Sequence, residues 1–252
     1  MDGVILHDYK CSCGKMHGEP RMYVSEKIIK RLKDNNVRFH ADDNISDYII
    51  SEEERNDLVD EVAIKFEDVL RTLIIDVDGD PNSQGTAKRL AKMYVHEIMS
   101  GRYYPEPRIA SFPNDDSTGS EPYTGMLVVR AELKSMCSHH HQPVTGTAYI
   151  GIIPRDNVIG LSKYIRIAQH QARRGTLQEQ LCGKIARAIS NATKSPDVAV
   201  YIEARHGCCE NRGISAGNSL TQTTVLLGDF LSDHSVKTEF FSNVKLQKYK
   251  CD

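Results

Sequence analysis

Residues 136–143, with the sequence MCSHHHQP, place one cysteine and three consecutive histidines within a short stretch. Cys137 and His140 form a C-x2-H pair. In a strand these two side chains would point to opposite faces, so a shared ligand requires a turn between them, and Pro143 supports an irregular chain there. On its own the stretch fits three interpretations: a metal site, a cluster of catalytic bases, or solvated imidazoles on a loop.

A second chemistry-bearing stretch is HGCCENRG, where Cys208 and Cys209 follow an expected strand. Two cysteines and one histidine bind zinc with one coordination position left open, which is typical of catalytic sites. His139 and His206 flank the candidate ligands, and imidazole titrates near neutral pH, which suits general acid or base catalysis. The alternative is that the cysteines are small apolar side chains in the core and the histidines are structural or surface groups.

A group of cationic and hydroxyl side chains could bind an anion. Part of it opens an expected helix in LSKYIRI, where free backbone N–H groups add to the charge. The sequence contains no G-x4-GK[ST] motif, so side chains would have to hold a phosphate here. Each of these residues alone also fits a solvated basic helix face. The candidates are Ser162, Lys163, Arg166, Arg212, Arg89 and Lys92.

The stretch TLQE has two interpretations. Thr176 and Glu179 have the spacing of a capping box, which is a purely structural role. Alternatively, Gln178 and Glu179 present an amide and a carboxylate at a helix start, and a carboxylate matches the two donors on the edge of guanine. The spacing alone favours the capping box.

The elements that must position these residues follow from apolar periodicity and turn signals. We expect helices with a capping box at Ser51 and Glu54, a loop over 101–122, and a core ordered strand, strand, helix, helix, strand, strand. Such a core is an α+β layer with an antiparallel four-stranded sheet, open edges and one uncovered face, and joining sheets edge to edge in an oligomer would remove these liabilities. The expected helices are 51–75, 86–100, 163–174 and 176–193, and the expected strands are 125–133, 144–154 turning into 158–163, 197–206 and 219–230.

Composition bounds the class of protein. With 252 residues, 40% apolar and 26% charged, the chain suits one core plus an appendage. With a net charge of −2 the protein as a whole is not attracted electrostatically to nucleic acid or to an anionic membrane, so we expect neither as a partner. The start MDGVILHDYK lacks a signal-peptide pattern, and seven cysteines set singly or in close pairs favour a reducing cytoplasm.

Three regions are expected along the chain. Residues 1–45 form an N-terminal extension, which is either disordered or a second metal knuckle built from Cys11, Cys13 and His17. Residues 46–122 form a helical region and a loop, and residues 123–252 form the catalytic core with its C-terminal tail.

From Ser51 to Asp229 the chain resembles the GTP cyclohydrolase I family. The resemblance rests on motifs in the family's order: KRLAKMYVHEI, MCSHHHQP, VIGLSKYIRI, ARRGTLQEQL and EARHGCCENRG. It implies the tunnelling fold, GTP as substrate, and formate and 7,8-dihydroneopterin triphosphate as products. It also implies a decamer of two face-to-face pentamers with active sites at subunit interfaces.

The resemblance also implies a role for each candidate residue. Water activated by zinc would attack carbon 8 of guanine, and the chain would supply an acid at nitrogen 7. Other side chains would assist ribose opening and bind the base and the triphosphate. The implied zinc ligands are Cys137, His140 and Cys208, with Cys209 as a neighbour. The implied acid is His206, His139 assists ribose opening, and Ser162 serves the triphosphate and the later sugar rearrangement. The implied substrate contacts are Glu179 with Gln178 on guanine, in preference to the capping box, and Lys163, Arg166 and Arg212 on the triphosphate, aided by Arg89 and Lys92 of a neighbouring subunit.

The sequence departs from the family pattern at five positions. Ser138 stands where the family usually has Glu, Thr176 and Gln180 replace the usual Gln and Arg, and Gly85 and Ala87 replace the usual Asp and Pro. None of these removes an implied metal ligand or catalytic histidine, so they bear on substrate affinity and assembly.

Two other functions remain open on the residues alone. One is a relative on the same fold that attacks a 7-deazapurine with a cysteine nucleophile, as nitrile reductases do, with Cys208 or Cys209 as the thiol. The other is a GTP-binding protein without catalysis.

Overall fold

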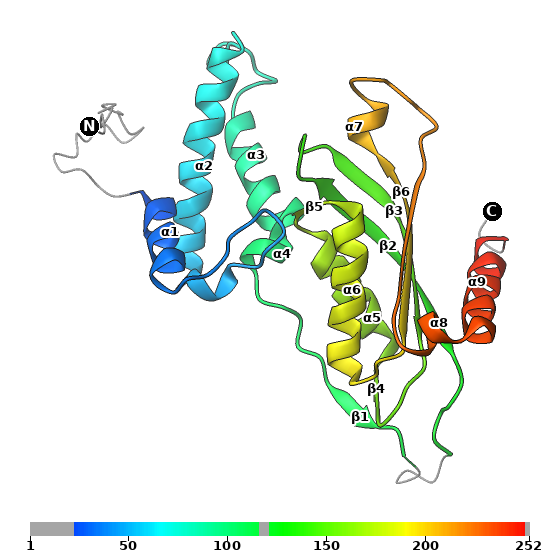
Figure 1. Ribbon diagram of the computed structural model, residues 1–252. Coiled ribbons are helices and arrows are strands. Elements are labelled where there is room, and N and C mark those ends of the chain that lie inside the picture. The colour runs from blue at the N-terminus through cyan, green and yellow to red at the C-terminus, as the bar shows by residue number, and fades with distance from the viewer. Residues whose placement is uncertain (1–22, 116–120, 250–252) are drawn as a thin grey trace.

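The computed structural model describes residues 23–115 and 121–249, so the suggested knuckle of Cys11, Cys13 and His17 lies outside the described residues. Figure 1 shows a group of N-terminal helices beside a mixed layer in which helices cover a twisted sheet. The fold is α+β, as expected. No helix among the described residues is both long and apolar enough to cross a membrane.

The sheet has five strands in the order β5-β2-β3-β6-β7, one more than expected. Four of them are antiparallel neighbours, and β5 adds a short parallel ladder at the end of β2. Strand β5 has only two residues, which is too short for periodicity to reveal. The strands are β2 (Leu127–Cys137), β3 (Pro143–Ile152), β5 (Gly175–Thr176), β6 (Val198–His206) and β7 (Thr221–Leu226).

The segment after β3 does not continue the main sheet as expected. Strand β4 (Asn157–Ile159) pairs instead with β1 (Ser111–Pro113), which lies inside the stretch expected to be loop. Asn114 anchors this small ladder, since its backbone N–H donates to Asp156 O at 2.8 Å and its side chain donates to Arg155 O at 2.9 Å. The pairing joins segments more than forty residues apart, which local spacing cannot predict.

Helices α5 (Leu161–Ala172) and α6 (Gln178–Thr193) cover one face of the sheet (Figure 1). The expected apolar stripe of α6 is confirmed at Leu181, Ile185 and Ile189, whose side chains are at most 2% exposed. The repeat of apolar residues every four positions places them on one helix face, and burying them drives the helix onto the sheet.

The second face of the sheet, expected to be uncovered, is partly covered by α8 (Asp229–Ser232) and α9 (His234–Tyr249). Phe230 and Phe240 are fully buried there and meet edge to face, with ring centroids 5.6 Å apart. The expectation of an open face was wrong because the C-terminal tail supplies its own apolar residues.

The N-terminal helices form a layer of their own. Ser51 caps α2 by accepting a hydrogen bond from Glu54 N at 3.0 Å. The Glu54 carboxylate does not complete the capping box but accepts from Ile50 N at 2.9 Å and pairs with Arg31. The elements are α1 (Val24–Asp34), η1 (Ser46–Tyr48), α2 (Glu52–Thr72), α3 (Thr86–Lys92), the π-helical η2 (Met93–Ile98) and α4 (Ser100–Tyr103).

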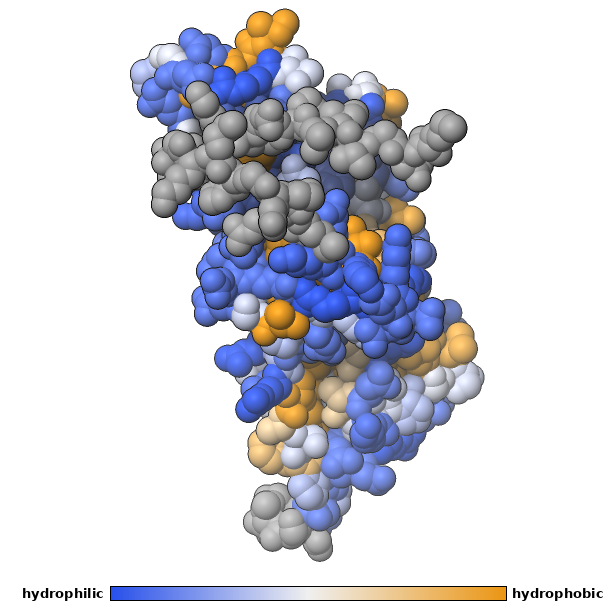
Figure 2. All heavy atoms as spheres, turned by 90° about the vertical axis from the view of Figure 1, so that its left-hand side faces the viewer, coloured by the Kyte–Doolittle hydropathy of each residue, from blue (hydrophilic) through white to orange (hydrophobic). Residues whose placement is uncertain are grey.

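Figure 2 views the molecule from the side of these helices and shows a largely hydrophilic surface with scattered small apolar areas. Leu73 and Ile74, just after α2, are 65% and 94% exposed. Isolated apolar residues of this kind are ordinary on a protein surface.

The N-terminal layer docks on the core through a close backbone approach at Gly101. A Cβ atom at this position would lie 2.1 Å from His170 O and 2.8 Å from Arg173 O at the end of α5. Asn44 supports the contact by donating its side-chain amide to Gly101 O at 3.0 Å and to Tyr104 O at 2.8 Å. The residue at 101 must therefore lack a side chain.

We expect Gly101→Ala to destabilise the protein by roughly 1–3 kcal/mol, because the new methyl group must push α4 away from α5. The matched control is Gly217→Ala, since a Cβ there meets no atom within 4 Å. The control should change the unfolding free energy by no more than about 0.5 kcal/mol. Urea unfolding followed by circular dichroism measures both, and equal stability of the two variants would contradict the close packing.

Candidate metal centre

The connection between β2 and β3 carries the first two candidate ligands. Strand β2 ends at Cys137, residues 138–140 form a turn, and β3 begins at Pro143. Two backbone hydrogen bonds of 2.9 Å close this connection, from Cys137 N to Gln142 O and from His141 N to Cys137 O. The turn required between Cys137 and His140 is therefore present.

The third candidate ligand comes from the end of β6. His206 is the last residue of that strand and pairs with Val144 at the start of β3. The chain then forms the one-turn helix α7 (Gly207–Glu210), which carries Cys208. The register thus sets Cys208 beside the connection that holds Cys137 and His140.

Cys137, His140 and Cys208 each offer a ligand atom, and these atoms all lie within 4.8 Å of one another. Cys137 is buried, Cys208 is half-buried and His140 is exposed, so the group opens toward solvent on one side. Two thiols and an imidazole at this spacing are compatible with a metal ion.

The proximity of these thiols favours a bound cation over two thiolates without one. Burial raises the pKa of Cys208 to about 11, and the adjacent Cys137 and Cys209 thiols add to the rise. A bound metal replaces the protons of its cysteine ligands, so it would reverse this crowding. The donor set therefore suits a thiophilic divalent cation.

Arg212 makes a hydrogen bond with His140 that is incompatible with metal binding at that imidazole. Its Nη1 lies 2.8 Å from His140 Nε2, and since a guanidinium only donates, Nε2 must carry the lone pair. Coordination through Nε2 would use that lone pair, and coordination through Nδ1 would leave a proton on Nε2. In either case metal binding at His140 would release Arg212.

His206 is oriented by Gln178 in the first turn of α6. The Gln178 amide nitrogen donates to Thr221 O at 3.0 Å and to Thr223 Oγ1 at 3.2 Å. This leaves Gln178 Oε1 to face His206 Nε2 at 2.7 Å, so we assign the proton of His206 to Nε2. Burial lowers the pKa of His206, while Glu179 and Glu210 act in the opposite direction.

The remaining members of the cluster lie around this pair. Glu179 is exposed on the first turn of α6, close enough for its charge to act on His206. His139 is exposed on the turn, with its ring edge-on to that of His140 at 6.3 Å. His141 has φ of 50° and lies against Tyr94 of η2, with ring centroids 5.8 Å apart. Spacing alone gave no signal for Tyr94, because it reaches the turn from a distant helix.

Apart from Arg212, one chain does not bring the candidate anion-binding residues to the candidate metal centre. Strand β3 runs from the centre to the opposite end of the sheet, about 30 Å away, and α5 begins there, as Figure 1 shows. Ser162 and Arg166 are exposed on that helix, and Lys163 Nζ lies 3.4 Å from Arg108 O.

The two candidate cations of α3 also lie outside the cluster of ligands. Arg89 and Lys92 are both exposed. The Arg89 guanidinium donates to Gln84 O at 2.9 Å and to Thr86 Oγ1 at 2.7 Å. Helix α3 runs directly into η2, which carries Tyr94 to the turn that holds the candidate ligand His140.

The capping box suggested at Thr176 does not form. Thr176 belongs to β5 and pairs with Cys137, and Leu177 caps α6 without a side-chain hydrogen bond. The Thr176 hydroxyl contacts Leu177 O at 3.2 Å. The short strand β5 therefore connects a candidate metal ligand to the start of α6.

Comparisons with known proteins agree on one family. The family model described as GTP cyclohydrolase I matches residues 65–245. A relative called GTP cyclohydrolase 1 from Campylobacter jejuni subsp. doylei is 36% identical over 73% of this chain and 96% of its own length. Relatives of the same name from Pseudoalteromonas translucida and Aeromonas hydrophila are 38% and 37% identical over 69% and 70% of this chain, and 94% and 79% of their own lengths.

A solved structure described as the archaeosine synthase QueF-Like in the apo form matches with a TM-score of 0.35 and 16% identity. It covers 43% of this chain and 97% of its own. This likeness is too weak to inform the fold or the chemistry.

We expect the reduced protein to bind Co²⁺, used as a spectroscopic probe, with the visible absorption of a tetrahedral thiolate site. Cys208→Ser should weaken binding by at least about tenfold, because it removes a ligand. Cys209→Ser is the matched control and should bind as the parent does. Equal losses in the two variants, or full binding by Cys208→Ser, would contradict the assigned ligand set.

Proposed function

The chain belongs to the GTP cyclohydrolase I family and its enzymatic activity is that family's, and from this premise we propose that Cys137, His140 and Cys208 hold the zinc ion of the reaction. The observation that carries the proposal is the meeting of these ligands, from two distant segments, beside a histidine whose orientation is fixed by Gln178. The reaction opens the imidazole ring of guanine, releases formate and yields 7,8-dihydroneopterin triphosphate.

When bound, zinc would supply the activation of water that hydrolysis at carbon 8 of guanine requires. With its Nε2 proton held by Gln178, His206 has Nδ1 as the ring atom that can accept a proton and pass it to nitrogen 7 of the base. Burial favours the neutral ring, which is the form that can accept a proton first. We assign the assistance of ribose opening to His139, which is exposed on the adjacent turn.

Guanine recognition is assigned to Glu179. Its exposed carboxylate can accept two N–H bonds from the base, in the bidentate geometry that such pairs favour. The side chain of Gln178, which the resemblance pairs with Glu179, already contacts His206, Thr221 and Thr223. We therefore assign Gln178 to positioning His206.

The triphosphate requires cations that one chain does not supply in one place. Arg212 is the one of these cations that lies beside the proposed zinc ligands, and metal binding at His140 would release it to contact the triphosphate. Ser162, Lys163 and Arg166 lie at the far end of the sheet, so we propose that a neighbouring copy contributes them. Arg89 and Lys92 would come from a further copy.

This proposal implies a homo-oligomer, with a decamer of two pentamers as the expected assembly. The exposed edge of β2 supports this assembly. Strand β5 pairs only with Met136 and Cys137, so the part of β2 before them has an open edge at which another chain can pair. The thiol ligands also suit a reducing cytoplasm.

The alternative of a cysteine nucleophile acting on a 7-deazapurine finds less support at Cys208, one of its two candidate thiols. A nucleophilic thiol needs a depressed pKa, whereas burial raises the pKa of Cys208 to about 11.

Incubating the zinc-loaded full chain with GTP should give formate and dihydroneopterin triphosphate, detected by mass spectrometry. Cys137→Ala and His140→Ala should lose turnover, since each removes a proposed ligand. A formamidopyrimidine product alone would contradict the proposed rearrangement at Ser162. Unchanged GTP, with zinc bound and the oligomer intact, would contradict the proposed function.

Gln178→Ala should lower kcat by roughly tenfold to a hundredfold and change KM for GTP little, because a misplaced acid–base group costs rate more than binding. Gln180→Ala is the matched control, since Gln180 is exposed two residues further along α6, and it should keep the parent kcat. A rise in KM at unchanged kcat would instead place Gln178 on guanine.

A further inference from the structure

A cavity of about 580 Å³ lies outside the candidate metal centre and is lined by residues of α5, of α6 and of the segment linking α4 to β1. Figure 1 shows this segment passing beside α6. Its volume is in the range of pockets that hold small organic ligands. Apolar side chains including Ile109 and Ile167 form part of the wall. The polar part of the wall is formed by Arg174, Lys184, Arg187, His170, Gln171 and Asn191.

Arg174 is a buried cation with an unused donor. Its side chain is only 5% exposed, and Nε has no hydrogen-bond acceptor among the described residues. The other guanidinium nitrogens make long contacts, to Asp42 O at 3.3 Å and to Glu106 Oε1 at 3.4 Å. The hydrogen bonding of this guanidinium within the described residues is therefore weak and incomplete.

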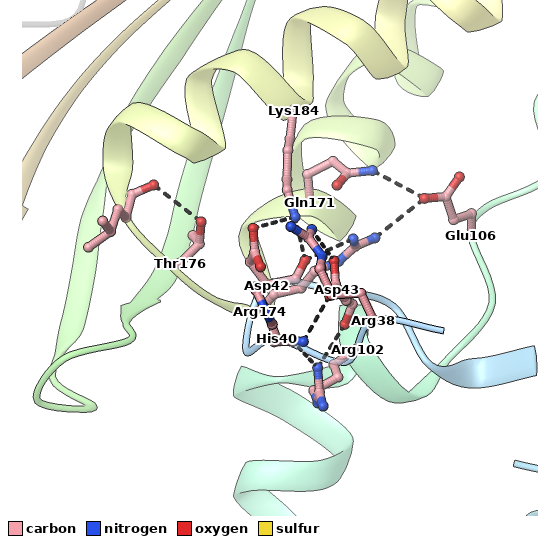
Figure 3. Close-up of polar contacts among 11 residues, drawn as sticks. Arg38, His40, Asp42, Asp43, Arg102, Glu106, Gln171, Arg174, Thr176 and Lys184 are labelled. Atoms are coloured by element: carbon pink, nitrogen blue, oxygen red, sulfur yellow. Dashed lines mark hydrogen bonds and ion pairs between the residues drawn. The ribbon is translucent and has the colours of Figure 1, made fainter. Parts of the chain in front are cut away.

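The neighbouring acids do not cancel the positive charge of the cavity. Asp42 is engaged by Lys184, with 2.5 Å between the carboxylate and Nζ, and Asp43 is engaged by Arg38 at 2.6 Å, as Figure 3 shows. Arg187 is exposed and makes no hydrogen bond or ion pair with the described residues. Counting Arg174, Lys184 and Arg187 against Asp42 and Glu106 leaves one positive charge.

Burial and the nearby Arg174 charge lower the pKa of His170 to about 4, so this ring is neutral at physiological pH. The His170 ring therefore makes part of the cavity wall polar without adding charge. The positive potential of the cavity comes from the arginines, and both of them can grip a carboxylate through two parallel N–H bonds.

A carboxylate of the chain itself already binds to donors of this cavity. The Glu106 carboxylate is 63% exposed at the cavity, and one of its oxygens accepts from Gln171 Nε2 at 3.2 Å and from Arg174 (Figure 3). Because these contacts are long and the Glu106 side chain is mostly exposed, an incoming carboxylate can replace Glu106 there.

We propose that this cavity binds a small organic carboxylate, with its charged group on Arg174 and Arg187 and its apolar body against Ile109 and Ile167. The carboxylate takes the place of Glu106 on Arg174 and neutralises the remaining positive charge. The apolar wall accounts for the part of the cavity that an inorganic anion would not fill. The proposal concerns a site separate from the metal centre and does not depend on the reaction there.

The test uses 2-naphthoate as the probe and ligand-detected NMR titration of the full chain as the measurement. 2-Naphthoate should bind at least tenfold more tightly than the neutral 2-naphthamide, because only the acid can pair with the arginines. Arg187→Ala should weaken naphthoate binding about tenfold, the cost of one charge-assisted contact. Arg173→Ala removes the same charge from an exposed position outside the cavity and should leave binding unchanged.

A second variant moves the affinity in the opposite direction. Glu106→Gln removes the competing carboxylate and should strengthen naphthoate binding several-fold, whereas a merely structural disturbance would weaken it. Equal binding of acid and amide, or a naphthoate affinity insensitive to both Arg187→Ala and Glu106→Gln, overturns the proposal. Binding of inorganic phosphate without binding of naphthoate overturns it too. Because the readout is binding, none of these outcomes depends on GTP turnover.

Discussion

The register between β2, β3 and β6 is the constraint on which the rest of the site depends. Met136 pairs with Pro143 and Val144 pairs with His206, so the β2–β3 turn and the end of β6 meet at the same end of the sheet. A slip of one residue would turn each strand's side chains to the opposite face and separate the two cysteines. The buried layer of α5 and α6 prevents the slip, since it would expose the core. The geometry of the candidate metal centre therefore depends on the packing of side chains that lie outside it.

Two buried polar side chains near the sheet illustrate opposite uses of hydrogen bonding. Gln178 has partners on both ends of its amide, and this completeness fixes which nitrogen of His206 carries the proton. Arg174 has one donor left over and two long contacts. A satisfied network holds a neighbouring group in place, whereas an incomplete one indicates where a ligand can be accommodated. The two residues lie four positions apart, on either side of β5.

Local chemistry made much of the site predictable from sequence. The C-x2-H spacing required a turn at Cys137, and the apolar repeat at Leu181 and Ile185 identified the face of α6 that is buried. Features set by distant contacts were not predictable. Thr176 has the spacing of a cap, but pairing with Cys137 holds it in a strand, because tertiary contacts outweigh a local preference. The cavity beside Arg174 likewise depends on segments that meet only after folding.

The strand order also has a consequence for how the protein holds together. Strand β3 lies between β2 and β6, so a metal on Cys137 and Cys208 would tie the ends of β2 and β6 together across an intervening strand. These residues are far apart in the sequence, so the complete ligand set forms only in the folded chain. An ion that binds only the folded form raises its stability with the logarithm of the ion's concentration. Metal supply would therefore set how long the folded protein persists as well as how fast it works, and a metal-starved chain would open first at this end of the sheet.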